Sequence, residues 1–224
     1  IVDLADGTLK RTIDARTELG IDHAFGGSLS NNVIDIDRNN SAASGFYSDD
    51  ALYIGYTQLD DSSCSAPTDF SANSETCKWT KGGVLRLTTK ENTNPDNWVL
   101  SKVIDGIGPV TTAIAKLQDR GNKNLWLFWG TGRYYYKTDD TSSTQQALYG
   151  IKDPCYNTTY KPGNYLDPTC TAAVSGTIVD QSGTGTAPAT TLSATAGGWK
   201  ILLDEPDTTN NYMTERVITD TLAV

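Results

Sequence analysis

Residues 108–153 read GPVTTAIAKLQDRGNKNLWLFWGTGRYYYKTDDTSSTQQALYGIKD, and this stretch decides the fold. Residues 110–117 alternate between two faces, as a β-strand does. Residues 125–129 are apolar at every position and rich in aromatic side chains, which is typical of a strand covered on both faces. Residues 134–136 resume that strand after two glycines, and residues 146–151 form the next one. The stretch predicts three successive strands inside a stack of β-sheets.

The same order of strands occurs twice along the chain. The first series is expected at residues 23–36, 51–56, 82–87 and 98–104. The second series is expected at residues 110–117, 124–136, 146–151 and 199–203. In both series the fourth strand begins at a Trp that follows a polar loop. A four-stranded unit that repeats with insertions in its loops is the sequence signature of a β-propeller.

The predicted fold is all-β, a partial β-propeller built of four-stranded antiparallel blades with long loop insertions. Residues 1–20 are interpreted as the end of a blade, with a hairpin over residues 1–14. The complete blades are expected at residues 21–105, with a calcium-type loop, and 106–204, with an insertion at about 152–198. Residues 205–224 supply a further strand, expected at 212–219.

Two complete blades are too few to close a ring of four to eight. The remaining blades are therefore expected from sequence of the parent protein or from partner chains. A β-sandwich of about nine strands is the alternative fold. Residues 171–198 are rich in Ala, Thr, Ser and Gly, and they are expected to form a surface excursion.

Composition limits the possible partners. The chain has 224 residues, a net charge of −9 and only 18 Lys plus Arg, which disfavours a nucleic-acid surface. No stretch approaches the roughly 18 apolar residues that a membrane span requires. Because neither a signal peptide nor an initiator Met is present, we expect a processed product or a piece of a longer chain.

The four cysteines fall into two local pairs, Cys64 with Cys77 and Cys155 with Cys170. Neither pair has C-x-x-C spacing and the chain contains a single His, so zinc is disfavoured. Each pair lies in a polar loop, where closing a loop of this length typically adds about 3 kcal/mol of stability. The pattern predicts two disulfides and a periplasmic or extracellular location, with free cytosolic thiols as the alternative.

The turn after the first strand of the first blade carries a candidate metal site. Asp35, Asp37 and Asn39 place oxygen ligands at alternate positions, and hard oxygen ligands suit calcium. Asp49 or Asp50 could close the coordination sphere. The spacing is not that of an EF-hand, and the corresponding turn of the second blade contains a lysine, which argues against a metal there. An ordinary Asx-rich turn is the alternative.

Other polar groups favour structural roles. His23 has no Ser or Cys motif to serve and is expected to be a half-buried strand residue. Arg133 is expected to make a structural ion pair between strands, whereas Asp139 and Asp140 are expected to lie in a solvated turn. The tyrosines and tryptophans are expected to pack between blades, with a sugar-stacking surface as the alternative.

Several of these motifs resemble one family. GPVTTAI, LWLFWGTGRYY and QQALYGIKDPC resemble the C-terminal β-propeller of the PilC/PilY type IV pilus tip proteins. The turn with Asp35, Asp37 and Asn39, followed by ALYIG at 51–55 and GGVLR at 82–86, looks like the calcium-loop blade of that family. The resemblance covers about residues 26–153. Residues 40–48 are an insertion relative to the compact family loop, so the closing ligand stays open between Asp49 and Asp50.

The resemblance implies a calcium-binding module that is exported through the periplasm and exposed at the cell surface on the pilus tip. Such a module would assemble with minor pilins, attach to host or abiotic surfaces, and support calcium-regulated extension and retraction. A quinone-dependent dehydrogenase propeller is one alternative, but the sequence provides no positioned base or cofactor clamp. A carbohydrate-binding propeller lectin is another. We therefore predict a binding and assembly module that is not an enzyme.

Overall fold

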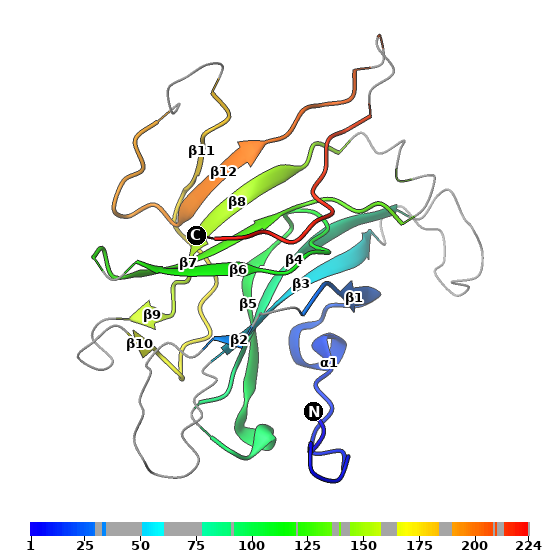
Figure 1. Cartoon of the computed structure of the whole chain (residues 1–224), viewed down its shortest axis with the longest axis vertical. Helices are drawn as coiled ribbons and strands as arrows, with labels where there is room; N and C mark the ends of the chain where they lie inside the picture. Colours follow the sequence, from blue (N-terminus) through cyan, green and yellow to red (C-terminus); the bar gives the residue numbers. More distant parts are fainter. Residues whose placement is uncertain are drawn as a thin grey trace.

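The computed structural model consists mainly of β-strands in two sheets (Figure 1). It describes residues 1–29, 33–34, 51–60, 78–90, 92–119, 121–135, 139, 144–157, 165–183, 190–207, 209 and 213–223. Within these ranges, no helix is long and apolar enough to cross a membrane. Neither sheet closes on itself. The structure therefore confirms the all-β class, whereas the ring of a propeller stays a prediction.

Sheet 1 is an antiparallel sheet of five strands. Its members are β1 (Ala24–Gly26), β2 (Val33–Ile34), β3 (Ala51–Asp60), β4 (Lys78–Thr88) and β5 (Val99–Asp105). Both β1 and β2 pair with β3, so they occupy one edge. The short 3-10 helix η2 (Pro95–Asn97) connects β4 to β5. All five strands lie within the first predicted blade.

Sheet 2 repeats this arrangement. Its antiparallel members, in order, are β6 (Ala115–Asp119), β7 (Asn124–Gly130), β8 (Ala147–Lys152) and β12 (Gly198–Leu202). A fifth strand, β11 (Ile178–Asp180), pairs with β12 in parallel. Between β8 and β11, the two-residue strands β9 (Tyr156–Asn157) and β10 (Tyr165–Leu166) pair with each other. All of these strands lie within the second predicted blade.

One apolar core lies between the two sheets. Alternate residues of β7 point into it, and all are at most 1% exposed: Leu125, Leu127 and Trp129. Burying a large apolar side chain contributes about 1.5–3 kcal/mol. Trp126 and Phe128 lie on the opposite, outer face and are only half-buried. The prediction that this strand is covered on both faces is therefore confirmed for the inner face, whereas the described residues leave the outer face half-buried.

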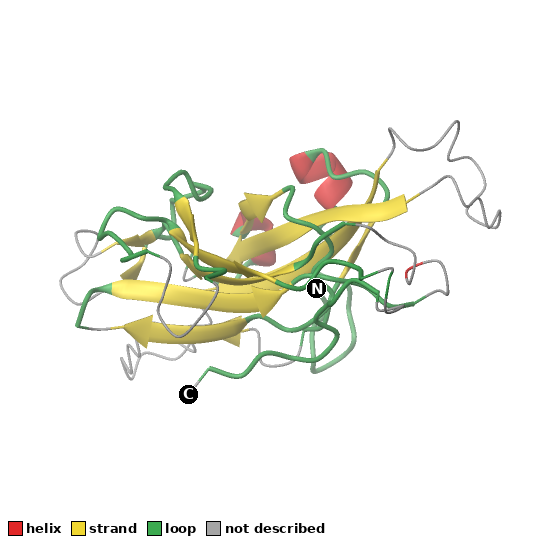
Figure 2. Ribbon diagram, turned by 90° about the horizontal axis from the view of Figure 1, so that it is seen from above, coloured by secondary structure: helices red, strands yellow, loops and turns green. Residues whose placement is uncertain are grey.

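The outer face of sheet 1 is covered by the N-terminal segment. Helix α1 (Ala15–Leu19) begins after Asp14, whose carboxylate accepts a hydrogen bond from the backbone N–H of Arg16. The helix ends at Gly20, whose φ of 68° is a left-handed conformation that glycine adopts readily. Ile21 is buried in a second apolar cluster on this face. Figure 2 shows α1 and the C-terminus on opposite sides of the strands.

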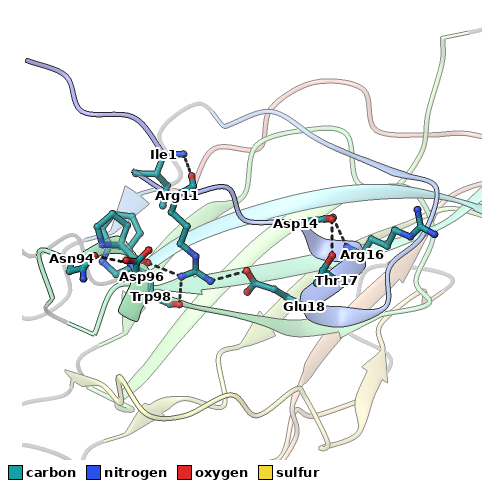
Figure 3. A network of polar contacts seen from close by, with 10 residues as sticks. Ile1, Arg11, Asp14, Arg16, Thr17, Glu18, Asn94, Asp96 and Trp98 are labelled. Carbon is teal, nitrogen blue, oxygen red and sulfur yellow. Dashed lines mark hydrogen bonds and ion pairs between the residues drawn. The ribbon is translucent and has the colours of Figure 1, made fainter. Parts of the chain in front are cut away.

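Arg11 holds this N-terminal segment against sheet 1 (Figure 3). Its guanidinium donates hydrogen bonds to the backbone oxygens of Pro95, at 2.7 Å, and Trp98, at 2.6 Å. It also donates to the carboxylate of Glu18 in α1, at 2.8 Å. The N-terminal amino group of Ile1 donates to the backbone oxygen of Arg11. One side chain therefore ties the helix, the β4–β5 connection and the chain start together.

The connection from β5 to β6 crosses sheet 1 strand by strand. Its hydrogen bonds to the strands it passes are Ile107 N to Gly82 O in β4, Val110 N to Tyr56 O in β3, and Ser28 N, just after β1, to Thr111 O. At the crossing point, a Cβ added to Gly55 would lie 2.5 Å from Cγ1 of Val110. Only glycine allows this close approach. The chain thus leaves one edge of sheet 1 and reaches the β1 edge before sheet 2 begins.

The C-terminal segment crosses sheet 2 in the same manner, as the red trace in Figure 1 shows. Its hydrogen bonds are Leu203 N to Gln146 O beside β8, Val217 N to Thr131 O after β7, and Ala113 N, before β6, to Oδ1 of Asp220. A Cβ added to Gly130 would overlap the side chain of Val217. Each sheet is therefore crossed by the chain that leaves its last antiparallel strand.

The two crossings occur at equivalent positions in the sheets. Gly55 pairs with Val84 of the following strand, and Gly130 pairs with Leu148. In both sheets, the start of the crossing chain donates a backbone hydrogen bond to the residue two positions before this partner. The acceptor is Gly82 O in sheet 1 and Gln146 O in sheet 2. The backbone N–H of the crossing valine then donates to the carbonyl oxygen of the residue after the glycine, which is Tyr56 in sheet 1 and Thr131 in sheet 2. The repeat that the sequence predicts for the strands thus includes the connection that follows them.

Three expectations for the connecting segments are wrong. Residues 110–114 are not part of β6, because the alternation there comes from a crossing chain packed between two sheets, with Val110 and Ile114 fully buried. Residues 1–14 reverse direction as expected of a hairpin, but their antiparallel pairing is confined to the bridge between Val2 and Leu9, so the expectation of two full strands is wrong. The described residues 213–219 contain no strand.

The expected surface excursion at residues 171–198 reaches the core. The backbone N–H of Val174 donates to the oxygen of Val103 in β5, at 2.9 Å. Ala196 is 5% exposed, and β11 extends sheet 2. Small side chains permit these contacts, since a Cβ added to Gly176 would lie only 2.7 Å from the backbone nitrogen of Gly197. The small side chains of this segment therefore allow two parts of its backbone to pack closely against each other.

Candidate functional site

The five predicted calcium ligands, Asp35, Asp37, Asn39, Asp49 and Asp50, lie outside the described residues. The described residues on either side of this segment are paired with each other, because Ile34 of β2 lies opposite Ala51 of β3. In the ranges that the structure describes, no group of three or more His, Cys, Asp or Glu side chains could hold a metal ion. The calcium site therefore stays a prediction that concerns one edge of sheet 1.

One predicted disulfide is present, between Cys155 and Cys170. It links the residues just before β9 to the turn that follows β10. Both cysteines belong to or pack against the core between the sheets. The other predicted pair, Cys64 and Cys77, lies outside the described residues.

A buried polar joint connects the two sheets, and it consists of Tyr53, Arg86 and Asp153. Arg86 of β4 reaches Oδ1 of Asp153, which follows β8, at 2.6 Å. The hydroxyl of Tyr53 in β3 donates to the other carboxylate oxygen at 2.5 Å. The Arg86 and Asp153 side chains are both 0% exposed. A buried carboxylate is costly unless it has such charged and hydrogen-bonded partners.

Backbone groups near the disulfide complete this joint. Cys155 N donates to Oδ1 of Asp153 at 2.8 Å, and Arg86 donates to the backbone oxygen of Ala172 at 3.0 Å. Nε of Arg86 has no hydrogen-bond partner among the described residues. Because the joint is closed to solvent and its carboxylate is fully engaged, it fits a structural role and not a ligand site.

A group of aromatic and arginine side chains joins the ends of both sheets, with two exposed tyrosines above a buried arginine. We call it the aromatic–arginine surface; its members are Phe25, Trp79, Arg133, Tyr134 and Tyr135. The rings of Phe25 and Trp79 lie 5.2 Å apart between centroids, and those of Phe25 and Tyr135 lie 6.0 Å apart. Tyr134 and Tyr135 are 51% and 58% exposed. This surface therefore offers aromatic ring faces to solvent.

Two arginines and one carboxylate organise the aromatic–arginine surface. Arg133 lies over the Trp79 ring and pairs with Asp139 at 2.5 Å. Asp139 also accepts from the backbone N–H of Tyr135, and its own backbone oxygen accepts from Arg216 at 2.7 Å. Because Asp139 neutralises Arg133, the surface favours ring stacking over anion capture.

The predictions for these residues had mixed success. The ion pair of Arg133 is confirmed, but its partner is a loop residue and not a strand residue. The solvated turn expected at Asp139 is wrong, because its side chain is only 11% exposed. The Arg86–Asp153 pair was not predicted; an arginine between apolar residues in 84–87 was the available signal. His23 lies just before β1, with a φ of 48°.

Comparisons with known proteins give no match. No family model matches the chain, and neither a curated protein nor a solved structure is significantly similar to it. The function of this chain has to be inferred from its own residues and contacts.

Proposed function

We propose that this chain forms two consecutive blades of a β-propeller that acts as a binding and assembly module and not as an enzyme. The observation that carries this proposal is the repeated crossing, Gly55 with Val110 and Gly130 with Val217. Each crossing starts beyond the last antiparallel strand of a four-stranded sheet and runs towards its first strand. That geometry supports radial repetition of one unit, because every new sheet then begins at the same edge.

The proposed location is the tip of a type IV pilus, reached by export through the periplasm. The sequence motifs that resemble the PilC/PilY proteins support this location. The Cys155–Cys170 disulfide is also typical of oxidising compartments outside the cytosol. The proposed partners are minor pilins at the tip, together with a host or abiotic surface.

Immunogold labelling of piliated cells with an antibody against this chain tests the location. Gold particles at filament tips are the expected result. Gold confined to the periplasm or to free medium would contradict the tip assignment. Cells that lack the gene for this chain provide the background control.

The proposed cofactor is calcium, held by Asp35, Asp37 and Asn39 with Asp49 or Asp50. Alternating oxygen ligands suit the large, flexible coordination sphere of this ion. The pairing of Ile34 with Ala51 supports the proposal, because it brings both ends of the ligand-bearing segment to one edge. The ion would draw the two ends of that segment together without a role in bond-making chemistry.

Isothermal calorimetry tests the calcium site. We expect calcium heat from the unmodified chain and none from Asp37→Ala. Asp119→Ala is the matched control, since this carboxylate at the end of β6 accepts hydrogen bonds from Asn122. No heat from the unmodified chain, or equal loss in both variants, would contradict the site.

A second candidate function, carbohydrate binding, is favoured by the exposed rings of Tyr134 and Tyr135. Aromatic faces stack on the apolar faces of sugar rings. On a glycan array, the chain should retain some ligands, and Tyr135→Ala should lose them while Tyr135→Phe keeps them. Unchanged binding by Tyr135→Ala, or no ligand at all, would contradict a sugar site at this surface.

A further inference from the structure

The outer face of sheet 2 is apolar, although sheets with a solvated face usually carry polar residues there. Trp126 and Phe128 stack at 6.1 Å between ring centroids, and Trp199 of β12 lies 6.1 Å from Phe128. On the strands that flank β7 and β8, Leu117 of β6 is 41% exposed and Ile201 of β12 is 37% exposed. We call this set the outer apolar face. A cross-strand row of aromatic and aliphatic side chains is the pattern of a covered sheet.

The opposite end of the stack is already covered. On the outer face of sheet 1, residues 11–21 bury an apolar cluster that includes Leu85, Leu87 and Leu100. On the outer apolar face, the covering contact among the described residues is that of the Val217 side chain with Gly130, at one end of β7. The two ends of the stack therefore differ, and the outer apolar face is the more exposed one.

The inner face of sheet 1 is equivalent in the repeat to the outer apolar face of sheet 2, and it is covered by a neighbouring sheet. The register places Ile201 at the position that Ile104 holds in sheet 1, and Leu148 at the position of Val84. Val84 and Ile104 are 0% and 8% exposed, because sheet 2 packs on them. Their equivalents in sheet 2 are half-buried or exposed. The crossing valine lies on the same face in both sheets.

We infer that the outer apolar face is the docking surface for a third four-stranded antiparallel sheet of the same repeat. This inference rests on the proposed repeat architecture and deepens it by assigning the face, the kind of partner and the edge where it begins. The partner sheet presents alternating aliphatic and aromatic residues, as the inner face of sheet 2 does. Its first strand lies next to the segment that contains Asp220, just as β6 follows the first crossing.

The charge distribution supports an apolar occupant. The chain carries a net charge of −9, yet the described charged side chains of this face, Lys152 and Asp119, lie towards one end of it, with Lys152 5.4 Å from the Trp126 ring. A face depleted of charge at its centre is typical of the core of an interface. The net negative charge of the chain then disfavours its non-specific association.

Photo-cross-linking in the natural host tests the inference. A benzophenone amino acid is placed at Leu117 or at Ile201 of the protein, and the linked peptide is identified by mass spectrometry. We expect a peptide from a strand with alternating apolar residues, within a series of four such strands. The same probe at Leu52 is the matched control, because Leu52 packs in the cluster covered by residues 11–21 and should link to them.

Three outcomes would overturn the inference. They are a link to the same face of a second copy, a link to a segment without strand alternation, and no link at either position while the Leu52 control reacts. Oxidative footprinting gives a check without substitutions: Trp126 and Trp199 should be oxidised in the purified chain and protected in cells. Equal oxidation in both would also overturn it.

The test separates this inference from the pilus assignment. Gold at pilus tips together with a bare outer apolar face would refute the docking surface alone. A cross-linked third sheet without gold at the tips would refute the location and leave the repeat architecture supported.

Discussion

At the scale of single residues, Asp153 determines how the two sheets are joined. Its carboxylate receives hydrogen bonds from Tyr53 and Arg86 of sheet 1 and from Cys155 of its own segment. A buried ion pair is costly to form, but it is far more costly to leave half-formed. The joint therefore favours one relative placement of the sheets over alternatives that the apolar core alone would tolerate.

Asp153→Ala should lower the free energy of unfolding by about 3–5 kcal/mol, because it leaves Arg86 charged and buried. Tyr53→Phe removes one hydrogen bond and should cost only about 1 kcal/mol. Urea denaturation measures both. Lys10→Ala, which removes an exposed ion pair with Asp3, is the control and should have little effect. Equal losses for Asp153→Ala and Lys10→Ala would contradict a structural role for the joint.

Lys116 should make stability depend on alkaline pH. Burial on the inner side of β6 lowers the pKa of Lys116 to about 8, from an ordinary value of 10.5. The unfolded chain then binds more protons between these two values, so the free energy of unfolding should rise as pH increases from about 8 to 10. Lys116→Met should remove that rise. The same slope in both proteins, measured by urea denaturation at several pH values, would contradict this assignment.

Sequence reasoning could identify some of these residues and not their partners. Arg133 was identifiable as an ion-pair residue because it follows a strand rich in aromatic residues. Its partner depends on how the loop containing Asp139 folds back, which no local pattern encodes. Arg86 and Asp153 are 67 residues apart, so their pairing follows only from the stacking of the sheets.

At the scale of elements, strands with a strong local pattern were predicted well. β3, β4, β5, β7, β8 and β12 all overlap their predicted ranges, because alternation and apolar runs are local properties. The crossing at 110–114 was taken for a strand, since two-sided packing imitates the alternation of a sheet. α1 was missed because five residues are too few for a helical period to be recognised.

The crossings predict specific effects of two alanine substitutions. Gly55→Ala and Gly130→Ala should each destabilise the chain by about 1–3 kcal/mol, because the added Cβ would collide with Val110 or Val217. Thermal unfolding monitored by circular dichroism measures both.

Gly26→Ala is the control for these substitutions, since its Cβ would make only an ordinary contact with Ile54 at 3.6 Å. Adding Val217→Gly to Gly130→Ala should recover part of the loss, because Cβ of Val217 is itself one of the colliding atoms, at 2.3 Å. If Gly130→Ala is neutral, the C-terminal crossing does not pack as described.

At the scale of the whole molecule, the two sheets share one core and one polar joint. The core cluster contains residues of β3, β4, β5, β7 and β8, so both sheets contribute to one shared interior, and sheet 1 adds the second cluster on its outer face. Sheets that cannot bury their faces alone gain stability only by stacking. The chain should behave as one cooperative unit in spite of its two repeats.

Urea denaturation should therefore give a single transition, with the same midpoint by tryptophan fluorescence and by far-UV circular dichroism. Trp129 reports the buried core, and a variant in which Trp79, Trp98, Trp126 and Trp199 are replaced by Phe isolates its signal from those of the other four tryptophans. Two separate midpoints would show that the sheets unfold independently, and the shared core would then not be the main source of stability.

The position of the disulfide has a consequence for the order of events during folding. Both acceptors of Arg86, the Asp153 carboxylate and the Ala172 carbonyl, lie two residues outside the loop that Cys155 and Cys170 close. This local closure, across 15 residues, holds the acceptors together before Arg86 arrives from 67 residues upstream. A preformed disulfide should thus speed up refolding, so the reduced chain should refold more slowly than the oxidised chain in stopped-flow experiments. Equal refolding rates would contradict this order of events.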